Sequence, residues 1–416
     1  MQRESPYPMV SIDEAQRIIT AHVAPLGIEE MDVLRNIADG RVLAEDVYAT
    51  DPLPDVPKAA VDGYALRSAD GVAPRRVIAE VTAGAAPGLR VEPGTAVRVM
   101  TGAPVPEGAD AVVMVEQTEE HEGTLTVRRA LSAGDNIHTV GQDIAAGQCV
   151  LMRGTTLGAA EIGLLATIGR VRAQVYRRPM VAVLATGDEV YEPDGEVFPG
   201  DVRDSNRYAL MAAAREAGCV AVSLGIARDD LSVQRAAILD AVDRADVLLT
   251  SGGVSMGTRD LIKPLLAELG TVHVGRIAFK PGKPTTFATI DRPGRAPLLV
   301  FGLPGFPVSS LVSFEVFVRP ALRRLQGDVR PERPRVRVAL RDPVHPSADR
   351  PEYQRAIVGW AEGRLVARST GRQGSSRLMS MLGANALLMV PPGTQPFPVG
   401  AELEALLTGP LALFSE

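Results

Sequence analysis

The sequence predicts an α/β fold combined with separate β-rich parts, and three observations support this prediction. Strands alternate with helices between residues 179 and 328, as expected for a mostly parallel sheet covered by helices on both faces. Short apolar runs broken by Gly and Pro fill 51–143 and 329–416, a texture typical of small β sandwiches and barrels. The 416 residues, with 40 Gly and 32 Pro, exceed the length that one core supports.

The N-terminal part is predicted to be elongated and interrupted by an insertion. Ser11 and Glu14 have the spacing of a capping box, which predicts a helix ending near His22. The runs "RRVIAEVTAG", "TAVRVMTG", "DAVVMVEQ" and "GTLTVRRAL" predict a β-rich domain over 51–143. A second helical pattern covers 157–168. We therefore expect residues 1–50 and 144–178 to form one linker domain into which the β domain is inserted.

Residues 179–328 contain the central α/β pattern. Strands are predicted in "MVAVLAT", "VAVSLGIA", "DVLLT", "VHVGRIAF" and "PLLVFG". Helices are predicted in "RYALMAAAREAG", capped by Asp204-Ser205-Asn206, and in "DDLSVQRAAILDAVDRA", "DLIKPLLAELG" and "PVSSLVSFEVFVRPALRRL". The runs "RPRVRVAL", "RLVARS", "ALLMVPPG" and "AELEALL" predict a C-terminal β-barrel domain over 329–416.

Composition excludes several classes of protein. A net charge of −6 argues against a bulk nucleic-acid binder. Two cysteines are too few for a disulfide framework, and the five histidines are scattered without the spacing of zinc ligands. No signal-peptide core opens the sequence, and no window reaches the roughly 20 apolar residues of a membrane span. These features predict a cytoplasmic protein with no membrane partner.

Four unusual loops follow predicted strands of the α/β part. In an open parallel sheet, ligands bind beyond the carboxyl ends of the strands, so these loops are expected to surround one crevice. They contain Thr186-Gly187-Asp188-Glu189, the Gly252, Gly253, Ser255 and Gly257 positions of "SGGVSMG", Lys280 and Lys283 with Pro284 of "KPGKP", and Pro304-Gly305 of "GLPGFPVS".

Each loop also has a purely structural explanation. "TGDE" alone is an ordinary turn at a helix start, and "SGGVSMG" is not a P-loop and could only initiate a helix. "GLPGFPVS" could be only a turn and an N-cap, yet Ser309 and the helix behind it form another N-terminus suited to an anion. "KPGKP" is harder to explain in this way, because its prolines hold two lysines together against their mutual repulsion. The lysine pair therefore indicates an anion.

Acidic residues near the same strand ends complement these cations. Asp188, Glu189, Asp229, Asp230 and Asp260 supply the oxygen ligands that Mg²⁺ prefers, although any one of them could be only a helix cap. Together with the lysines, they predict a site for Mg²⁺ and a phosphorylated ligand.

The motifs "TGDEV", "DSNRYAL", "TSGGVSMG", "KPGKP" and "GLPGFPVS" occur in this order, flanked by "VDGYALR", "VMTGAPVPEGADAVVM", "GQDI", "YQR" and "RQGSSRL". With them, the chain resembles the molybdopterin molybdenumtransferase family, which includes MoeA and the gephyrin E domain. The resemblance covers nearly the whole chain. It implies that the central domain is of the molybdopterin-binding type and that the protein inserts molybdate into adenylylated molybdopterin with Mg²⁺, releasing AMP and molybdenum cofactor. It also implies an elongated homodimer and the possibility of a molybdopterin adenylyltransferase partner.

The same resemblance implies roles for individual residues. Positions from the inserted domain that face the partner's cleft are Asp62, Thr101 and Asp143; acidic positions of the α/β domain are Asp188, Glu189, Asp229 and Asp260. The expected molybdate pocket is formed by Ser255, Lys280, Lys283, Pro284, Arg355 and Ser375. Within these sets we expect Asp188 and Asp260 to hold Mg²⁺. Molybdate is a tetrahedral dianion, and cationic and hydroxyl donors are the groups that bind such an ion.

Two departures from the family pattern leave alternatives open. Phe306 stands where Asn is usual, and an aromatic ring cannot replace the hydrogen bonds of an amide. "KAAVDGYAL" also lacks the Ser or Asn that commonly precedes the motif. The alternatives are a paralogue acting on another metal oxyanion or pterin nucleotide, and a non-catalytic dimeric scaffold. Retention of the charged set favours the enzyme.

Overall fold

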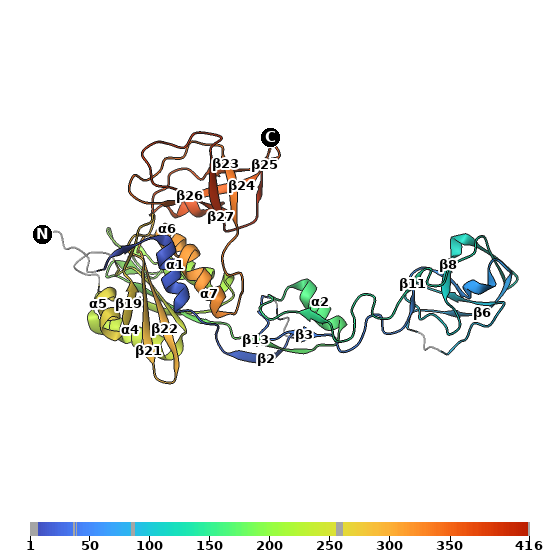
Figure 1. Ribbon diagram of the computed structural model, residues 1–416. Helices are drawn as coiled ribbons and strands as arrows, with labels where there is room; N and C mark the ends of the chain where they lie inside the picture. The colour runs from blue at the N-terminus through green and yellow to red at the C-terminus, as the bar shows by residue number, and fades with distance from the viewer. Residues whose placement is uncertain (1–6, 36–37, 39, 85–87, 255–260, 415–416) are drawn as a thin grey trace.

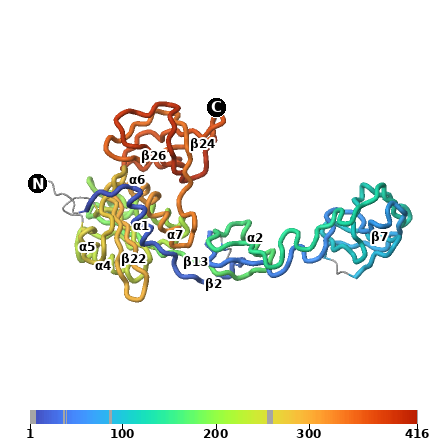
Figure 2. The backbone as a smooth tube through the Cα atoms, in the orientation of Figure 1, coloured from blue at the N-terminus to red at the C-terminus, as the bar shows by residue number. Residues whose placement is uncertain are grey.

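The computed structural model describes residues 7–35, 38, 40–84, 88–254 and 261–414. Figures 1 and 2 show an elongated molecule, with the α/β sheet and the C-terminal domain at one end and the inserted β sheet at the other. The segment that carries α2, Ala159–Thr167, lies between them (Figure 1). Within the described ranges, no helix combines the length and apolar character needed to cross a bilayer.

The α/β sheet has the strand order β17-β14-β18-β22-β21-β19. The first four strands, Val220–Ala227, Met180–Thr186, Val247–Ser251 and Arg295–Leu303, are mutually parallel. β21, Thr286–Arg292, is antiparallel both to β22 and to β19, Thr271–Val274. The predicted mostly parallel sheet is therefore confirmed. β21, which forms a hairpin with β22, is not among the strands predicted from the sequence.

Helices cover both faces of this sheet and give the domain three layers. α3 (Asn206–Glu216), α6 (Pro307–Ser313) and α7 (Arg319–Leu325) pack with α1 (Ile12–Ala21) on one face. α4 (Leu231–Arg244) and α5 (Ile262–Leu269) pack on the other. The predicted final helix is divided by a π-helical turn, Phe314–Val318. The wider turn lies just before Pro320, which lacks the N–H of a regular helix.

The N-terminal segment divides its packing between two regions. Ser11 Oγ accepts a hydrogen bond from the Glu14 N–H at 3.1 Å, as the capping box predicts. Ala15 and Ile19 of α1 then join the core of the α/β domain, and β1 (Met9–Val10) pairs with β20 (Arg276–Ile277). Downstream, β2 (Ile28–Asp32) pairs with β13 (Arg172–Tyr176), and β3 (Val47–Tyr48) with β12 (Cys149–Leu151). The four-domain division stays a prediction.

The α/β region also contains a short parallel pair, β15 (Val190–Tyr191) with β16 (Val202–Arg203), and the inserted and C-terminal regions each form a larger β sheet. The inserted sheet has the order β8-β5-β7-β6-β10-β9, formed by Ala111–Met114, Gly63–Leu66, Thr95–Val99, Arg75–Val81, Thr124–Val127 and Thr118–His121. Beside it, β4 (Lys58–Ala59) pairs with β11 (Ile137–His138).

The C-terminal sheet has the order β25-β23-β27-β26-β24, formed by Arg364–Ser369, Arg335–Leu340, Glu402–Leu407, Ala386–Val390 and Glu352–Ala361, with β28 (Ala412–Leu413) added to β24. Because β24 pairs with β25 as well as with β26, the sheet closes on itself. The predicted C-terminal β-barrel is therefore confirmed.

Candidate functional site

A single cavity of about 890 Å³ lies at the carboxyl ends of the parallel strands, which is a typical volume for a small-molecule site. All four loops singled out in the sequence contribute to its wall. The contributing residues among those predicted for the site are Thr186, Gly187, Glu189, Asp229, Gly252, Gly253, Pro284, Pro304 and Gly305. The topology explains this convergence, because β14, β18 and β22 are parallel neighbours and therefore end at the same edge.

The loop after β18 approaches the loop after β14 closely. Gly252 has φ +92°, and a Cβ there would lie 2.8 Å from the carbonyl oxygen of Thr186. Thr186 Oγ1 in turn donates to the Ser251 carbonyl at 3.2 Å. Only glycine fits this left-handed, crowded position. The Gly252 N–H donates to the Leu303 carbonyl at 3.1 Å, which ties the loop after β18 to the end of β22. The predicted Ser255, Gly257 and Asp260 lie outside the described residues.

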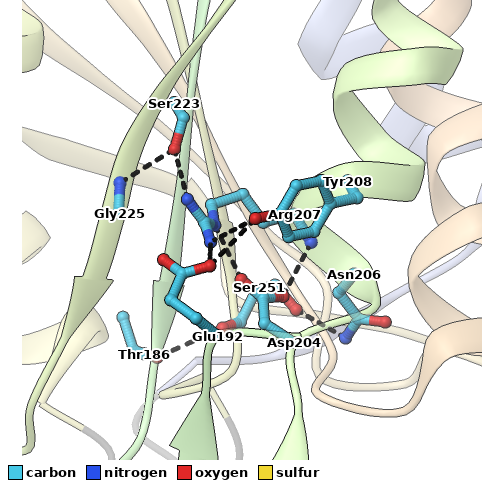
Figure 3. A network of polar contacts seen from close by, with 9 residues as sticks. All are labelled: Thr186, Glu192, Asp204, Asn206, Arg207, Tyr208, Ser223, Gly225 and Ser251. Carbon is cyan, nitrogen blue, oxygen red and sulfur yellow. Dashed lines mark hydrogen bonds and ion pairs between the residues drawn. The ribbon is translucent and has the colours of Figure 1, made fainter. Parts of the chain in front are cut away.

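A network of polar contacts supports the opposite wall of the cavity (Figure 3). Asn206 Nδ2, at the start of α3, donates to Ser251 Oγ and to the Gly305 carbonyl, both at 2.7 Å. These two bonds tie α3 to the loops after β18 and β22. Asn206 Oδ1 is buried without a hydrogen-bond partner among the described residues.

Arg207 forms the centre of this network (Figure 3). Its guanidinium donates to Asp204 Oδ2 at 2.7 Å, Glu192 Oε2 at 2.5 Å and Ser223 Oγ at 2.5 Å. Burial acts to lower the pKa of Arg207, but the hydrogen bonds and charges of Asp204 and Glu192 outweigh burial and raise it. A buried arginine that is paired in this way stays charged and holds the α3 N-terminus against the cavity.

The predicted magnesium ligands are only partly described. Asp188 Oδ1 accepts a hydrogen bond from the Asp229 N–H at 3.0 Å, which joins the loops after β14 and β17. Glu189 and Asp229 line the cavity. Among the described residues, no three His, Cys, Asp or Glu side chains form a group that could hold a metal.

The lysine loop lies next to the cavity and reaches it through Pro284. Lys283 is exposed, and the Lys280 side chain is 44% exposed. Lys280 Nζ lies 3.3 Å from Glu352 Oε1 of the C-terminal barrel. The loop thus connects the α/β domain to the barrel, and among the described cavity residues neither lysine forms part of the wall.

Arg355 and Ser375 come from the barrel side of this junction. Arg355 is fully buried and donates from Nε to Ser380 Oγ and from Nη2 to the Gly374 carbonyl, each at 3.1 Å. Its Nη1 is buried with no partner in the described structure. Burial lowers the pKa of Arg355 to about 10. The Ser375 carbonyl accepts from the Val308 N–H at 3.1 Å, which places the "RQGSS" loop against α6.

The inserted-domain residues lie away from this cavity within one chain. Thr101 donates to Asp62 Oδ1 from its N–H at 2.6 Å and from its hydroxyl at 2.7 Å. These bonds lower the pKa of the Asp62 carboxyl, the backbone bond most strongly. Asp62 directly precedes β5, and Thr101 follows the end of β7. Both strands belong to the inserted sheet, whose β6 and β8 lie at the opposite end of the molecule from the α/β sheet (Figure 1). Asp143 is exposed, and its N–H donates to the Leu53 carbonyl at 2.9 Å.

Several cavity residues were not among the predicted site positions. They are Arg203, Asp204, Asn206, Ser251, Phe306, Ser309 and Ser376. Asn206 and Ser251 belong to motifs that the sequence analysis quoted, so the motifs themselves were the usable signal. Glu352 directly precedes "YQR" and gave no signal of its own, because its role depends on a contact with a loop of another domain.

Comparison with known proteins agrees with this geometry. Residues 182–324 match the family described as a probable molybdopterin binding domain. Residues 10–169 match the MoeA N-terminal region (domain I and II), and 337–408 match the MoeA C-terminal region (domain IV). The chain belongs to the MoeA family of molybdenum cofactor biosynthesis proteins.

Individual relatives are similar over nearly the whole chain. A Bacillus subtilis (strain 168) protein named molybdopterin molybdenumtransferase is 34% identical, over 98% of this chain and 95% of its own length. Gephyrin from Dictyostelium discoideum is 36% identical over 99% of this chain, which spans only 64% of gephyrin. The crystal structure of the molybdopterin biosynthesis moeA protein from Pyrococcus horikoshii OT3 has a TM-score of 0.82 and 28% identity, covering 96% of this chain and 100% of that one.

Proposed function

We propose that this protein is a molybdopterin molybdenumtransferase, which inserts molybdate into adenylylated molybdopterin and releases AMP and molybdenum cofactor. The observation that carries the proposal is the cavity of about 890 Å³ in which the four loops meet. Full-length relatives that bear the transferase name support it. The cavity is large enough for a pterin nucleotide.

The proposed site divides into two adjoining parts. The cavity between α3 and the loops after β14, β18 and β22 receives the pterin nucleotide through backbone N–H groups and Asn206. The junction of Lys280, Lys283, Arg355 and Ser375 receives molybdate. The unpartnered Nη1 of buried Arg355 supports the second assignment, because a buried guanidinium donor without an acceptor is costly unless a ligand accepts its hydrogen bond.

No protein nucleophile is required in this proposal. The phosphoanhydride of the adenylylated substrate is already activated, so the protein contributes position and charge neutralisation. Lys280, Lys283 and Arg355 orient the oxyanion, and the networks around Asn206 and Arg207 keep the nucleotide-facing wall rigid. An oxygen of molybdate attacks the adenylyl phosphorus, and the bond from that phosphorus to the pterin phosphate breaks. AMP leaves with the attacking oxygen, and the dithiolene sulfurs of the pterin take up the metal.

For Mg²⁺ we propose Asp188 with Asp260, next to Glu189 and Asp229. The donor set fits, because Mg²⁺ is commonly held by one or two carboxylates together with substrate phosphates and water. A group of three acidic ligands is therefore not needed. When bound, the ion supplies charge neutralisation at the phosphates, while Asp188 also keeps its bond to the Asp229 N–H.

We further propose that the active form is a homodimer. Asp62 and Thr101 are held together by two hydrogen bonds, yet the inserted sheet that they adjoin lies at the opposite end of the molecule from the α/β sheet (Figure 1). A second copy can bring its inserted domain to this cavity, which would also place Asp143 there. A molybdopterin adenylyltransferase that hands over the adenylylated substrate is a further proposed partner.

The central experiment removes the cations of the molybdate part. The double variant Lys280→Ala with Lys283→Ala is expected to lose molybdate-dependent AMP release, because the dianion loses two counter-charges. Arg244, an exposed cation of α4 paired with Asp240 at 2.9 Å, gives the matched control Arg244→Ala. Unchanged AMP release in the double variant would refute the assignment. Absence of molybdate-dependent turnover in the wild type would favour the scaffold, and turnover with another oxyanion would favour the paralogue.

A further inference from the structure

A buried carboxylate lies at the junction between the lysine loop and the barrel, where the proposed function places an anion. The Glu352 side chain is 3% exposed, and its Oε1 lies 3.3 Å from Lys280 Nζ. In the described structure, Lys280 is the only cation within ion-pair distance of Glu352. A carboxylate beside an oxyanion site opposes binding of the oxyanion, so its presence needs a physical reason.

The backbone holds this pair in a fixed position. The Lys280 N–H donates to the Pro351 carbonyl at 2.9 Å, and the Tyr353 N–H donates to the Lys280 carbonyl at 2.7 Å. Lys280 and Glu352 are thus neighbours in a parallel bridge at the start of β24. The carboxylate is carried on a barrel strand, which is more rigid than a loop.

In the proposed molybdate part of the site, the summed charge matches a dianion once Glu352 is included. Lys280, Lys283 and Arg355 provide three positive charges, and Glu352 removes one of them. The remaining positive charge equals the negative charge of molybdate in magnitude. Without Glu352, Lys280 would lose its ion-pair partner in the described structure and could adopt many rotamers.

We infer that Glu352 is a positioning residue, an internal counter-ion that fixes the Lys280 ammonium and competes with the incoming oxyanion for it. This inference rests on the proposed function. Binding of molybdate transfers Lys280 from the carboxylate to the oxyanion. The carboxylate thereby weakens binding of the oxyanion while it keeps Lys280 correctly placed.

The direction in which Glu352→Gln changes the affinity for molybdate distinguishes competition from a merely structural role. Glu352→Gln keeps an acceptor for Lys280 but removes the competing charge, so the molybdate Kd measured by calorimetry is expected to fall about fivefold, the scale of a half-exposed ion pair. Glu352→Ala removes both the competing charge and the acceptor that positions Lys280, so this variant is expected to bind molybdate more weakly than Glu352→Gln. If Glu352 has only a structural role, both variants should bind molybdate more weakly than the wild type or equally well.

A matched control is Glu315→Gln. Glu315 pairs with Arg333 at 3.0 Å, with side chains 15% and 17% exposed, outside the described cavity wall. This variant also breaks a buried ion pair and is expected to leave the molybdate Kd unchanged. If it changes the Kd as Glu352→Gln does, the effect is general destabilisation and the inference is overturned.

A crystal structure of the wild-type protein with molybdate tests the same inference without any variant. Lys280 Nζ is expected to contact the oxyanion and to lie beyond ion-pair distance of Glu352. Molybdate bound while Lys280 keeps its contact with Glu352 overturns the inference alone, as does wild-type binding that Glu352→Gln fails to tighten. Absence of molybdate binding by the wild type overturns the proposed function as well.

Discussion

Asp62 and Thr101 show how a surface carboxylate can be kept ionised without any burial. Two donors of Thr101 converge on Asp62 Oδ1, at 2.6 and 2.7 Å. Both bonds favour the charged form and lower the pKa of this carboxyl. Because the folded pKa lies below the unfolded one, the bonds stabilise the protein above the unfolded pKa, and this contribution is lost as the pH falls through the folded pKa.

Removal of the Thr101 hydroxyl is therefore expected to raise the pKa of Asp62. Thr101→Val keeps the backbone N–H bond, so the pKa should rise only part of the way to its ordinary value. A pH titration of the Asp62 carboxyl carbon by NMR measures this change. Thr101→Ser, which keeps the hydroxyl, is the control. Equal pKa values in the Val variant and the wild type would show that the hydroxyl bond contributes nothing.

Residues whose position follows from the end of a strand were predicted from the sequence. Residues whose position follows from a contact between domains were not. Thr186, Gly252 and Gly305 could be placed at one crevice because parallel neighbours end at the same edge. Glu352 could not be found, because its partner Lys280 belongs to another domain. Alternation and turn residues identify strands, but they do not indicate which distant loop a buried carboxylate meets.

At the scale of elements, two features of the α/β domain were not predicted, because local sequence patterns do not indicate contacts between distant segments. β21 was overlooked because "TFATIDR" follows the lysine loop directly and shows no helix on either side. The docking of α1 on the α/β core also depends on distant residues. The local pattern predicted both ends of α1, at Ser11 and near His22, but not the surface on which the helix packs.

The loop between β20 and β21 depends on Gly282 for its shape. Gly282 has φ +129°, and a Cβ there would lie 2.5 Å from the Phe279 ring and 2.6 Å from Ser313 Oγ. Gly282→Ala is expected to lower the free energy of unfolding by about 1–3 kcal/mol and to raise the KM for molybdate, because the lysine on either side must move. Urea denaturation and steady-state kinetics measure the two effects.

Gly294, in the β21–β22 hairpin, is the matched control for that change. It has φ +68°, but a Cβ there would meet nothing within 4 Å. Gly294→Ala therefore introduces backbone strain but no steric clash. It should lower the free energy of unfolding through that strain alone and leave the KM for molybdate unchanged. If both variants lose the same stability and keep the same KM, the crowding at Gly282 has no effect on the lysine loop.

At the scale of the whole molecule, the elongated shape separates two sets of site residues. The α/β sheet, whose strand ends carry the cavity, lies at one end, and the inserted sheet, which Asp62 and Thr101 adjoin, lies at the other (Figure 1). Separate hydrophobic cores in the α/β, linker and inserted regions maintain this extension. If both sets serve one reaction, each active site needs residues from two chains.

Mixing of two inactive variants tests this arrangement directly. One chain carries Asp62→Ala and the other Lys280→Ala, and each homodimer is expected to be inactive. A heterodimer contains one site with both changes and one site with neither. Random pairing should therefore restore about one quarter of the wild-type AMP release, since half of the dimers are mixed and half of their sites are intact. Each variant chain with wild type serves as the pairing control. No recovery above the separate homodimers would mean that each site is built from a single chain.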